Sequence, residues 1–340
     1  ECGGILHIEY NYESLKELGD NIIEKHEYSI WRYKNMLPIR DETKIISLKE
    51  GWTPIIEAKR LPKELGLSKI LLKDETRNPS GSFLDRGVSV DISKAIEVGY
   101  RSATCGSTGN LAASVAAYAA ASGLRAHIYV PRKIDIGKLY QMAIYGADIY
   151  IVNNFEEALY RSEMLFLESY VISVSNPWYL EGVKTTGLEI AEQLNYNLPD
   201  HIILAAGSGA HLVTMYKAFK ELCEIGLLDE LNTSFTAVQP TVADPIAKAF
   251  RENQEDVLPI KVEGDTIATD IAIGNPSHGN EVLKIVRKTG GKVLSISDEE
   301  IINSMSALAR FEGVLAEPSA AIALGGLKAL VEEGLSLIHI

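Results

Sequence analysis

Short apolar runs alternate with helical periodicity along most of the chain. The runs are rich in aliphatic residues, and most are apolar on both faces, as buried parallel strands are. The predicted strands are 70–73, 102–105, 126–130, 147–152, 170–174, 202–205, 235–238 and 292–295. Apolar positions at helical spacing fill the intervals, for example over 111–122, 138–145, 155–168, 212–225 and 299–311. This alternation predicts an α/β fold with doubly wound, mostly parallel sheets.

The composition is that of an ordinary globular protein, since 46% of the 340 residues are hydrophobic and 23% are charged. It excludes disordered, collagen-like and disulfide-scaffold classes. The formal net charge of −13 and the lack of a basic run argue against a nucleic-acid or membrane partner. The longest nearly apolar stretch, 111–124, contains Ser and Gly and is too short to span a bilayer. The scattered cysteines, Cys2, Cys105 and Cys223, predict a reducing, cytoplasmic location.

Metal binding has little support in the sequence. Cys2-Gly-Gly could belong to a zinc ribbon, so residues 1–12 could be the remnant of such a segment, but no cysteines accompany it at ligand spacing. A plain amino-terminal turn is the simpler interpretation. The 7 histidines form no close ligand pair, so no catalytic metal is expected. Residues 335–340 continue no pattern of helix or strand.

Two polar turns lie between a predicted strand and a predicted helix, where α/β proteins bind ligands. In Cys105–Asn110, the residues Ser107 and Thr108 place hydroxyls and amides at a helix start. They could bind an anion or simply cap the helix. In Ala206–His211, two glycines let the backbone approach a ligand, and successive amides can surround a phosphate. This second turn is not a dinucleotide-binding fingerprint, because the glycine pattern fails at Leu212.

A dense polar loop after the first predicted strand carries the strongest signal. Its segment Asn78-Pro-Ser-Gly-Ser-Phe-Leu-Asp-Arg-Gly87 resembles the cofactor loop of threonine synthases, which reads Asn-Pro-Thr-Gly-Ser-Phe-Lys-Asp-Arg-Gly. Further motifs of that family follow in the family's order, namely Cys105–Asn110, Gly137–Leu139, Tyr145–Ala147, Ser175–Pro177, Leu180–Gly182, Lys184–Thr185, the turn at Gly207, Ile273–Pro276 and Glu317–Ala321. The resemblance covers residues 48 to 330, and the ordered set of motifs makes it specific.

The resemblance implies an architecture, a cofactor and a reaction. Threonine synthases are fold-type-II enzymes, similar to the tryptophan synthase β subunit, with two interleaved doubly wound sheets. They use pyridoxal 5'-phosphate to convert O-phosphohomoserine into threonine and phosphate. By analogy, residues 13–86 and 181–340 are expected to form a large cofactor-binding domain and residues 87–180 a small mobile domain. A homodimer is the family's usual assembly, and an amino acid is the expected small-molecule partner.

The resemblance also assigns roles to individual residues. Phe83 lies in the cofactor loop, and Asn110 is expected to hydrogen-bond the ring hydroxyl of the cofactor. The residues expected to hold the cofactor phosphate are Gly207, Ser208, Gly209, Ala210 and His211. Ser107, Thr108 and Gly109 are expected to receive the substrate carboxylate. Asn176 and Tyr179 lie in the run that contacts the rest of the substrate.

Leu84 is the most important departure from the family. Threonine synthases have a lysine there, whose amine forms a Schiff base with the cofactor and then moves protons among the substrate carbons. Leucine has no nitrogen and can do neither. Lys73 and Lys184 match lysines that the family has beside the catalytic one, so neither is expected to replace it.

Tyr179 is the second departure. The family usually has an arginine at this position, which grips the substrate phosphate with a fixed fork of donors, whereas a phenol donates one neutral hydrogen bond. Three functions therefore stay open. The protein could be threonine-synthase-like with little native activity, a non-catalytic ligand-binding or regulatory subunit, or a lyase that acts on a non-phosphorylated amino acid.

Overall fold

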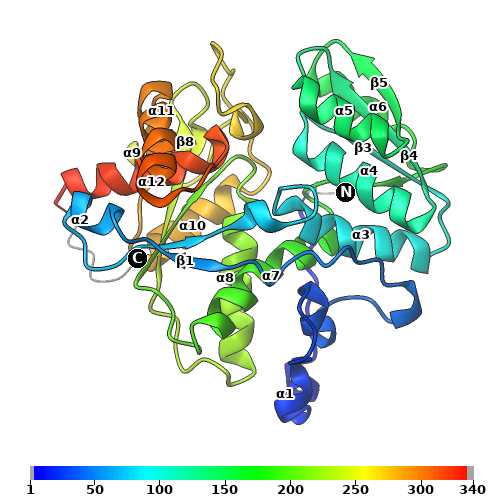
Figure 1. The fold of residues 1–340 in the computed structure, drawn as a ribbon, viewed down its shortest axis with the longest axis horizontal. Coiled ribbons are helices and arrows are strands. Elements are labelled where there is room, and N and C mark those ends of the chain that lie inside the picture. The colour runs from blue at the N-terminus through cyan, green and yellow to red at the C-terminus, as the bar shows by residue number, and fades with distance from the viewer. Residues whose placement is uncertain (1–3, 335–340) are drawn as a thin grey trace. The chain divides into compact units, whose positions relative to one another are not determined.

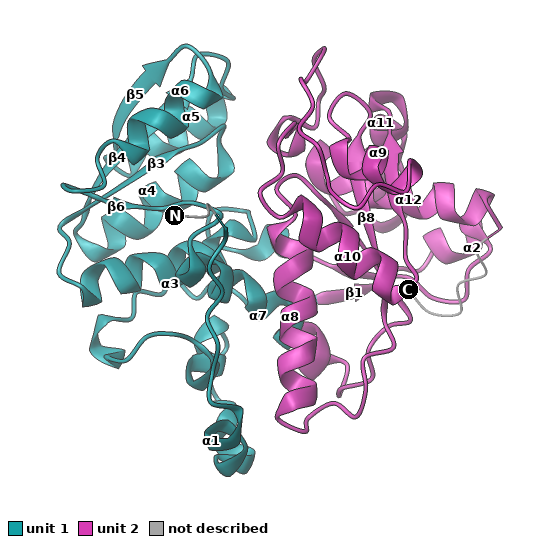
Figure 2. Ribbon diagram, turned by 180° about the vertical axis from the view of Figure 1, so that it is seen from behind, with its two compact units in different colours: residues 1–54, 75–189 teal, residues 55–74, 190–340 magenta. Residues whose placement is uncertain are grey.

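The computed structural model describes residues 4–334, and the chain divides into two compact units. Unit 1 contains residues 1–54 and 75–189, and unit 2 contains residues 55–74 and 190–340 (Figure 2). Each unit is built around its own parallel sheet. The boundary at residues 189 and 190 falls inside one long helix, α7 (Pro177–Gln193).

Unit 1 contains a four-stranded parallel sheet in the order β5-β4-β3-β6. Its strands are β3 (Ser102–Gly106), β4 (Arg125–Pro131), β5 (Asp148–Val152) and β6 (Tyr170–Val171). Its longer helices, besides most of α7, are α3 (Leu84–Glu97), α4 (Asn110–Ser122), α5 (Ile136–Ile144) and α6 (Phe155–Glu163). The chain steps outward from β3 to β5 and then returns to β6, so right-handed crossovers place α6 on the face opposite α4 and α5. Buried residues of α3, α4 and the sheet share one apolar cluster.

Unit 2 contains a three-stranded parallel sheet in the order β7-β8-β9 and a separate antiparallel pair, β1 with β2 (Figure 1). The strands are β1 (Ile55–Glu57), β2 (Leu71–Lys73), β7 (His201–Ala205), β8 (Ser234–Pro240) and β9 (Val293–Ile296). The α-helices are α2 (Leu61–Leu65), α8 (Ala210–Glu224), α9 (Pro245–Arg251), α10 (Gly279–Thr289), α11 (Asp298–Ala307) and α12 (Pro318–Glu332). Helix α12 lies across all three parallel strands. Gly326 permits this approach, because a β-carbon there would lie 2.4 Å from Val238 Cγ2.

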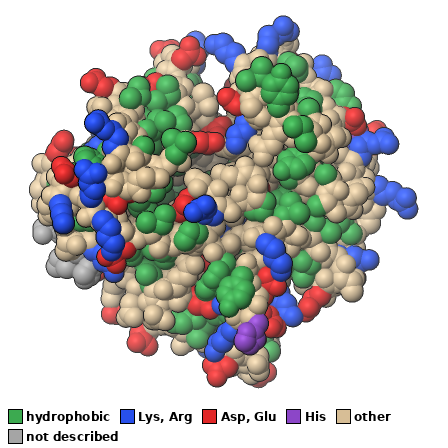
Figure 3. Space-filling view, viewed as in Figure 1, with side chains coloured by type: hydrophobic (Ala, Val, Ile, Leu, Met, Phe, Trp, Pro, Cys, Tyr) green, Lys and Arg blue, Asp and Glu red, His purple; other side chains and the backbone are tan. Residues whose placement is uncertain are grey.

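Shorter helical segments occur in both units. They are α1 (Tyr12–Glu17), five 3₁₀ segments at Gly19–Ile22, Ile30–Met36, Glu42–Lys44, Glu75–Arg77 and Thr269–Ile271, and a π-type turn at Leu308–Glu312. Within residues 4–334, no helix combines the length and the apolar character needed to cross a membrane. Acidic and basic side chains are interspersed over the face drawn in Figure 3.

The predicted fold class is confirmed, since both main sheets are parallel and alternate with helices. The predicted strand at 170–174 is shorter than expected and ends at Val171. It stops because the Ser173 hydroxyl and carbonyl accept from the amides of Ser175 and Asn176, which turns the chain. The predicted helix at 299–311 ends at Ala307, and the π-type turn continues it.

The compact units have different bounds from the expected large and small domains. Residues 13–54 and 75–86 group with unit 1, because Ile46, Leu48 and Leu84 from these segments pack against the apolar cluster of the β3–β6 sheet. A division of the molecule by its motions stays a prediction. Cys2, on which the zinc-ribbon interpretation depends, lies outside the described residues.

Candidate functional site

The first predicted ligand-binding turn joins β3 to α4 in unit 1. The Ser107 hydroxyl accepts from the amides of Gly109 at 3.0 Å and Ala112 at 3.3 Å, so this side chain caps the helix. Ser107 and Asn110 are buried, and Thr108 is half-buried. The first amides of an α-helix have no partner within it, so the capped turn still presents donors to an anion.

A cationic side chain lies beside this turn. Cγ of Lys138 lies 3.5 Å from the position that a β-carbon on Gly109 would take. Lys138 is held there by the start of α5, where the Asp135 carboxylate accepts from the Lys138 amide at 3.1 Å. The stem of this lysine thus lies beside the amino end of α4, where a cation within reach favours an anion.

The polar loop before α3 is anchored through Asp85. Its carboxylate accepts from the amide of Ser80 at 2.7 Å, the hydroxyl of Ser80 at 2.6 Å and the hydroxyl of Ser114 at 2.5 Å. Burial raises the pKa of Asp85, and the hydrogen bonds oppose that rise in part. Leu84 and Phe83, directly before Asp85, are half-buried and pack against the apolar cluster of unit 1.

Arg86 fixes the start of α3 from the other side. Its guanidinium is fully buried and bonds Glu189 Oε1 at 2.5 Å and Glu75 Oε2 at 2.7 Å. It also donates to the hydroxyls of Thr185 and Thr53, both at 3.1 Å. Burial opposes the charge, but the two carboxylates raise the pKa of Arg86 well above its ordinary value. The network therefore fixes the backbone that carries residue 84.

Lys73 and Lys184, the two lysines considered as replacements for a lysine at position 84, both bind other groups. In unit 2, Lys73 Nζ donates to Gln193 Oε1 at 3.0 Å. In unit 1, Lys184 is fully buried, pairs with Glu181 and donates to the Met36 carbonyl at 3.0 Å. Its ammonium lies 4.4 Å from the centre of the Tyr10 ring. That neither amine replaces a lysine at position 84 stays a prediction.

Tyr179 lies in the core of unit 1. It is 1% exposed, and its ring covers Gly87, where a β-carbon would approach within 2.4 Å of the ring. Within the described residues its hydroxyl has no hydrogen-bond partner. Burial, with Asp91 and Asp85 nearby, raises the pKa of this phenol well above its ordinary value. A direct contact of Tyr179 with substrate stays a prediction.

The side chain of Asn176 forms hydrogen bonds with residues close to it in the chain. Its Oδ1 accepts from the Trp178 amide at 3.2 Å, and its Nδ2 donates to the Tyr170 hydroxyl at 3.2 Å. Its role towards substrate likewise stays a prediction.

The second predicted turn joins β7 to α8 in unit 2, and both of its glycines lie close against neighbouring segments. Gly209 has φ +89°, and a β-carbon there would lie 2.6 Å from Val282 Cγ2. A β-carbon on Gly207 would lie 3.0 Å from the Cα of Ile271. The Ser208 hydroxyl accepts from the Ala210 amide at 3.3 Å. His211 follows in the first turn of the 15-residue helix α8. The first amides of any α-helix have no hydrogen-bond acceptor within the helix itself.

These features fit a phosphate group. Backbone amides at a glycine turn and at a helix start are the usual donors to such an anion. The glycines allow close approach of the backbone, and burial of Gly207 and Gly209 shields the donors from water.

Sequence reasoning missed two residues, one that fixes the loop before α3 and one that supports the turn at 206–211. Arg86 was seen only as part of a motif, and its partner Glu189 lies 103 residues away. Gln239 was not singled out, although its side chain donates to the carbonyl of Ala206 at 3.1 Å. Neither residue lies inside a predicted strand or helix, and the partners of both are distant in the chain, so the sequence carries no local signal that identifies them.

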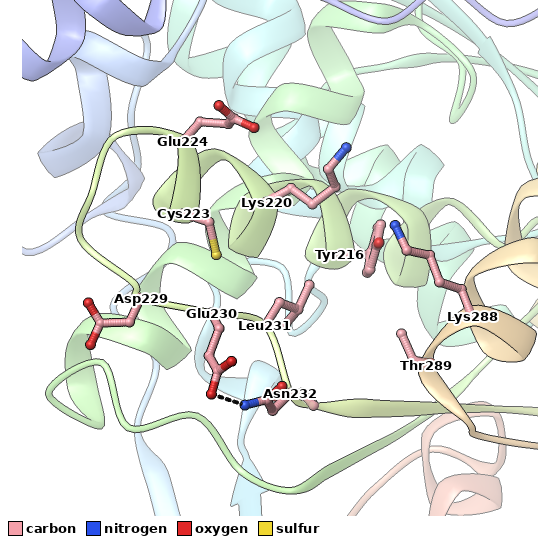
Figure 4. Close-up of a pocket in the computed structure, with 11 residues that line it drawn as sticks. Tyr216, Lys220, Cys223, Glu224, Asp229, Glu230, Leu231, Asn232, Lys288 and Thr289 are labelled. Atoms are coloured by element: carbon pink, nitrogen blue, oxygen red, sulfur yellow. Dashed lines mark hydrogen bonds between the residues drawn. The ribbon is translucent and has the colours of Figure 1, made fainter.

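A cavity of about 500 Å³ lies elsewhere in unit 2, between α8, α10 and the 229–233 segment (Figure 4). Tyr216, Lys220, Cys223 and Lys288 contribute to its lining. It contains none of the predicted site residues, so it adds nothing to the turn at 207–211.

Comparisons with known proteins agree on the family. The model of the pyridoxal-phosphate dependent enzymes matches residues 46–336. A threonine synthase of Methanocaldococcus jannaschii is 42% identical, in an alignment that covers 98% of this chain and 84% of that protein. One from Methanosarcina acetivorans is 36% identical, over 98% of this chain and 82% of that protein.

Solved structures share the fold at lower identity. Maize serine racemase superposes with a TM-score of 0.70 at 24% identity, over 83% of this chain and 84% of that chain. An L-serine ammonia-lyase from Rhizomucor miehei gives a TM-score of 0.72 at 24% identity, over 84% and 89%. These two show the fold alone. The family match and the threonine synthase relatives show that the chain belongs to the pyridoxal-phosphate dependent enzymes and, among them, to the threonine synthase family.

Proposed function

We propose that this threonine-synthase-like protein binds pyridoxal phosphate non-covalently, together with an amino acid, and has lost most of the family's turnover. The turn at Gly207–His211 carries the cofactor part of this proposal. Its glycine at φ +89° and the amides that begin α8 form a site for a phosphate dianion. Asn110, at the start of α4, is the residue proposed for the ring hydroxyl.

The amino-acid part of the proposal depends on the turn before α4. Ser107, Thr108 and Gly109 precede a helix start, and the stem of Lys138 lies beside Gly109. A carboxylate is favoured at such a position by the helix amides and by the lysine charge. Pyridoxal phosphate, when bound, withdraws electrons from the carbon that carries the amino group of the substrate.

The loss of turnover follows from residue 84. Leu84 has no atom that can bond to the cofactor or carry a proton, and Lys73 and Lys184 already bind other partners. Covalent catalysis requires its nucleophile. We therefore propose that threonine formation from O-phosphohomoserine is slow or absent in this chain.

The burial of Tyr179 favours a second candidate, a ligand-binding or regulatory subunit. A neutral, buried phenol supplies no positive charge for a substrate phosphate. A ligand without a phosphate group therefore suits this site better than O-phosphohomoserine does. A lyase that acts on a non-phosphorylated amino acid is consistent with the same observation. A cytoplasmic homodimer remains part of the proposal.

One set of assays separates these functions. The protein is incubated with pyridoxal phosphate, and release of phosphate from O-phosphohomoserine and of ammonia from serine or threonine is followed. Calorimetry with a panel of amino acids measures binding. Phosphate release at a rate typical of enzymes, about 1 per second or faster, would refute the proposed loss of turnover. Amino-acid binding without either product favours the ligand-binding subunit, and ammonia release identifies a lyase.

A further inference from the structure

The phosphate-binding turn is fixed by two carbonyl groups that face back into unit 2. The Ala206 carbonyl accepts from Gln239 Nε2 at 3.1 Å, and the Ser208 carbonyl accepts from the His278 amide at 2.9 Å. Gln239 lies on β8, and His278 directly precedes α10. The two contacts therefore come from different elements and bind alternate peptide groups of one turn.

Peptide geometry converts these contacts into a direction for the amides. A trans peptide is planar, so its N–H points opposite to the carbonyl of the same peptide group. Since the Ala206 carbonyl points to Gln239, the Gly207 N–H points away from Gln239. By the same reasoning the Gly209 N–H points away from His278. The contacts thus direct two glycine amides to the side of the turn that faces away from β8 and α10.

Gln239 is held in this orientation by its other atom. It is fully buried, and its Oε1 accepts from the amides of Ile246 at 2.9 Å and Ala247 at 3.1 Å. Both of those partners are donors, so the oxygen must face α9 and the NH₂ group must face Ala206. Rotation of the amide would put two donors against donors and leave the Ala206 carbonyl without this partner.

We propose that Gln239 is a positioning residue for the cofactor phosphate, acting through the Ala206–Gly207 peptide. This inference depends on the proposed binding of pyridoxal phosphate at the same turn. A donor held in place before binding costs no reorganisation when the anion arrives, so the gain appears as affinity for phosphate. Gln239 itself does not touch the cofactor.

The test compares pyridoxal phosphate with pyridoxal, which has the same ring and no phosphate. Affinities for both are measured by titration of the intrinsic fluorescence of the full-length protein. In Gln239→Met the donor is lost without adding a charge, and we expect pyridoxal phosphate to bind about tenfold more weakly, the effect of one charge-assisted hydrogen bond. Pyridoxal affinity should stay within about twofold, since its binding lacks the phosphate contact.

Two further variants keep the test decisive. Gln239→Glu preserves acceptors for Ile246 and Ala247 but removes the donor, so it should show the same selective loss if Gln239→Met does not fold. Asp244→Asn is the matched control, because Asp244 bonds Ser295 and Arg251 at the same end of α9. It should keep both affinities.

The outcomes separate this inference from the proposed function. A wild-type protein without preference for pyridoxal phosphate over pyridoxal contradicts the proposed function, and the inference is then overturned with it. A wild-type preference that both Gln239 variants retain overturns the inference alone. An equal loss of both ligands in the variants also overturns it, since that indicates only a structural role.

Discussion

At the scale of single residues, the start of α3 places the apolar side chain of Leu84 directly before two buried charged residues, Asp85 and Arg86. Leu84 packs on the apolar cluster, while Asp85 and Arg86 are buried and bonded to partners from several segments. Arg86 compensates two carboxylates that would otherwise be costly to bury. The loop therefore keeps its shape although position 84 carries no amine.

Arg86→Gln should destabilise the protein strongly. The substitution leaves Glu189 and Glu75 without their cation, and breaking a buried ion pair costs about 3–5 kcal/mol. The free energy of unfolding from denaturant titration measures this loss. Arg161→Gln is the matched control, because its pair with Glu157 is exposed to solvent and contributes little to stability. Equal losses in the two variants would contradict the role given to the network.

Gly209→Ala should cost more stability than Gly226→Ala. Both glycines have positive φ, +89° and +78°, so both variants lose about 1–2 kcal/mol to backbone strain. At Gly209 the new methyl group also meets Val282 Cγ2 at 2.6 Å, while nothing lies within 4 Å at Gly226. Denaturant titration compares the two variants, and binding of pyridoxal phosphate should fall only for Gly209→Ala. A larger loss at Gly226 would contradict this packing.

At the scale of elements, parallel strands place the candidate site at their carboxyl ends. The turns at 107–109 and 206–209 both lie between a strand and the helix that follows it. In unit 2, β8 supports this arrangement at both ends. Gln239 near its carboxyl end supports the turn, and Thr236 nearer its amino end bonds His201 of β7 at 2.8 Å.

The His201–Thr236 contact predicts a pH dependence. Burial lowers the pKa of His201 from 6.5 to about 4, so the folded protein holds the neutral ring. The unfolded chain binds a proton more readily between these values, so this contribution is complete above about pH 6.5 and is lost as the pH falls towards 4. Unfolding free energies of the wild type and His201→Gln, measured from pH 4 to 7, should converge as the pH falls. A difference that stays constant over this range would contradict the assignment.

At the scale of the whole molecule, the sequence predicted the alternation of strands and helices and the two turns correctly. Apolar runs such as 126–130 and 235–238 need no distant partner to be recognised, because burial on both faces is encoded locally. The turns were found because glycine and hydroxyl residues between a strand and a helix have a local meaning.

What the sequence left out depends on distant contacts. The burial of Tyr179 follows from its position over Gly87, which lies 92 residues earlier in the chain. Gln239 and Arg86 likewise act on partners that only the fold brings near. Strand β2 was predicted as the run at 70–73, but its partner β1 was missed, because three residues are too few to show a period.

The measurement that tests the central claim most directly is covalent capture of the cofactor by Leu84→Lys. The wild type and the variant are saturated with pyridoxal phosphate and reduced with borohydride, and the mass of each protein is then measured by mass spectrometry. We predict that the variant gains a violet absorbance and retains one cofactor after reduction, while the wild type binds the cofactor and retains none. A folded Leu84→Lys variant that binds no pyridoxal phosphate would contradict the account.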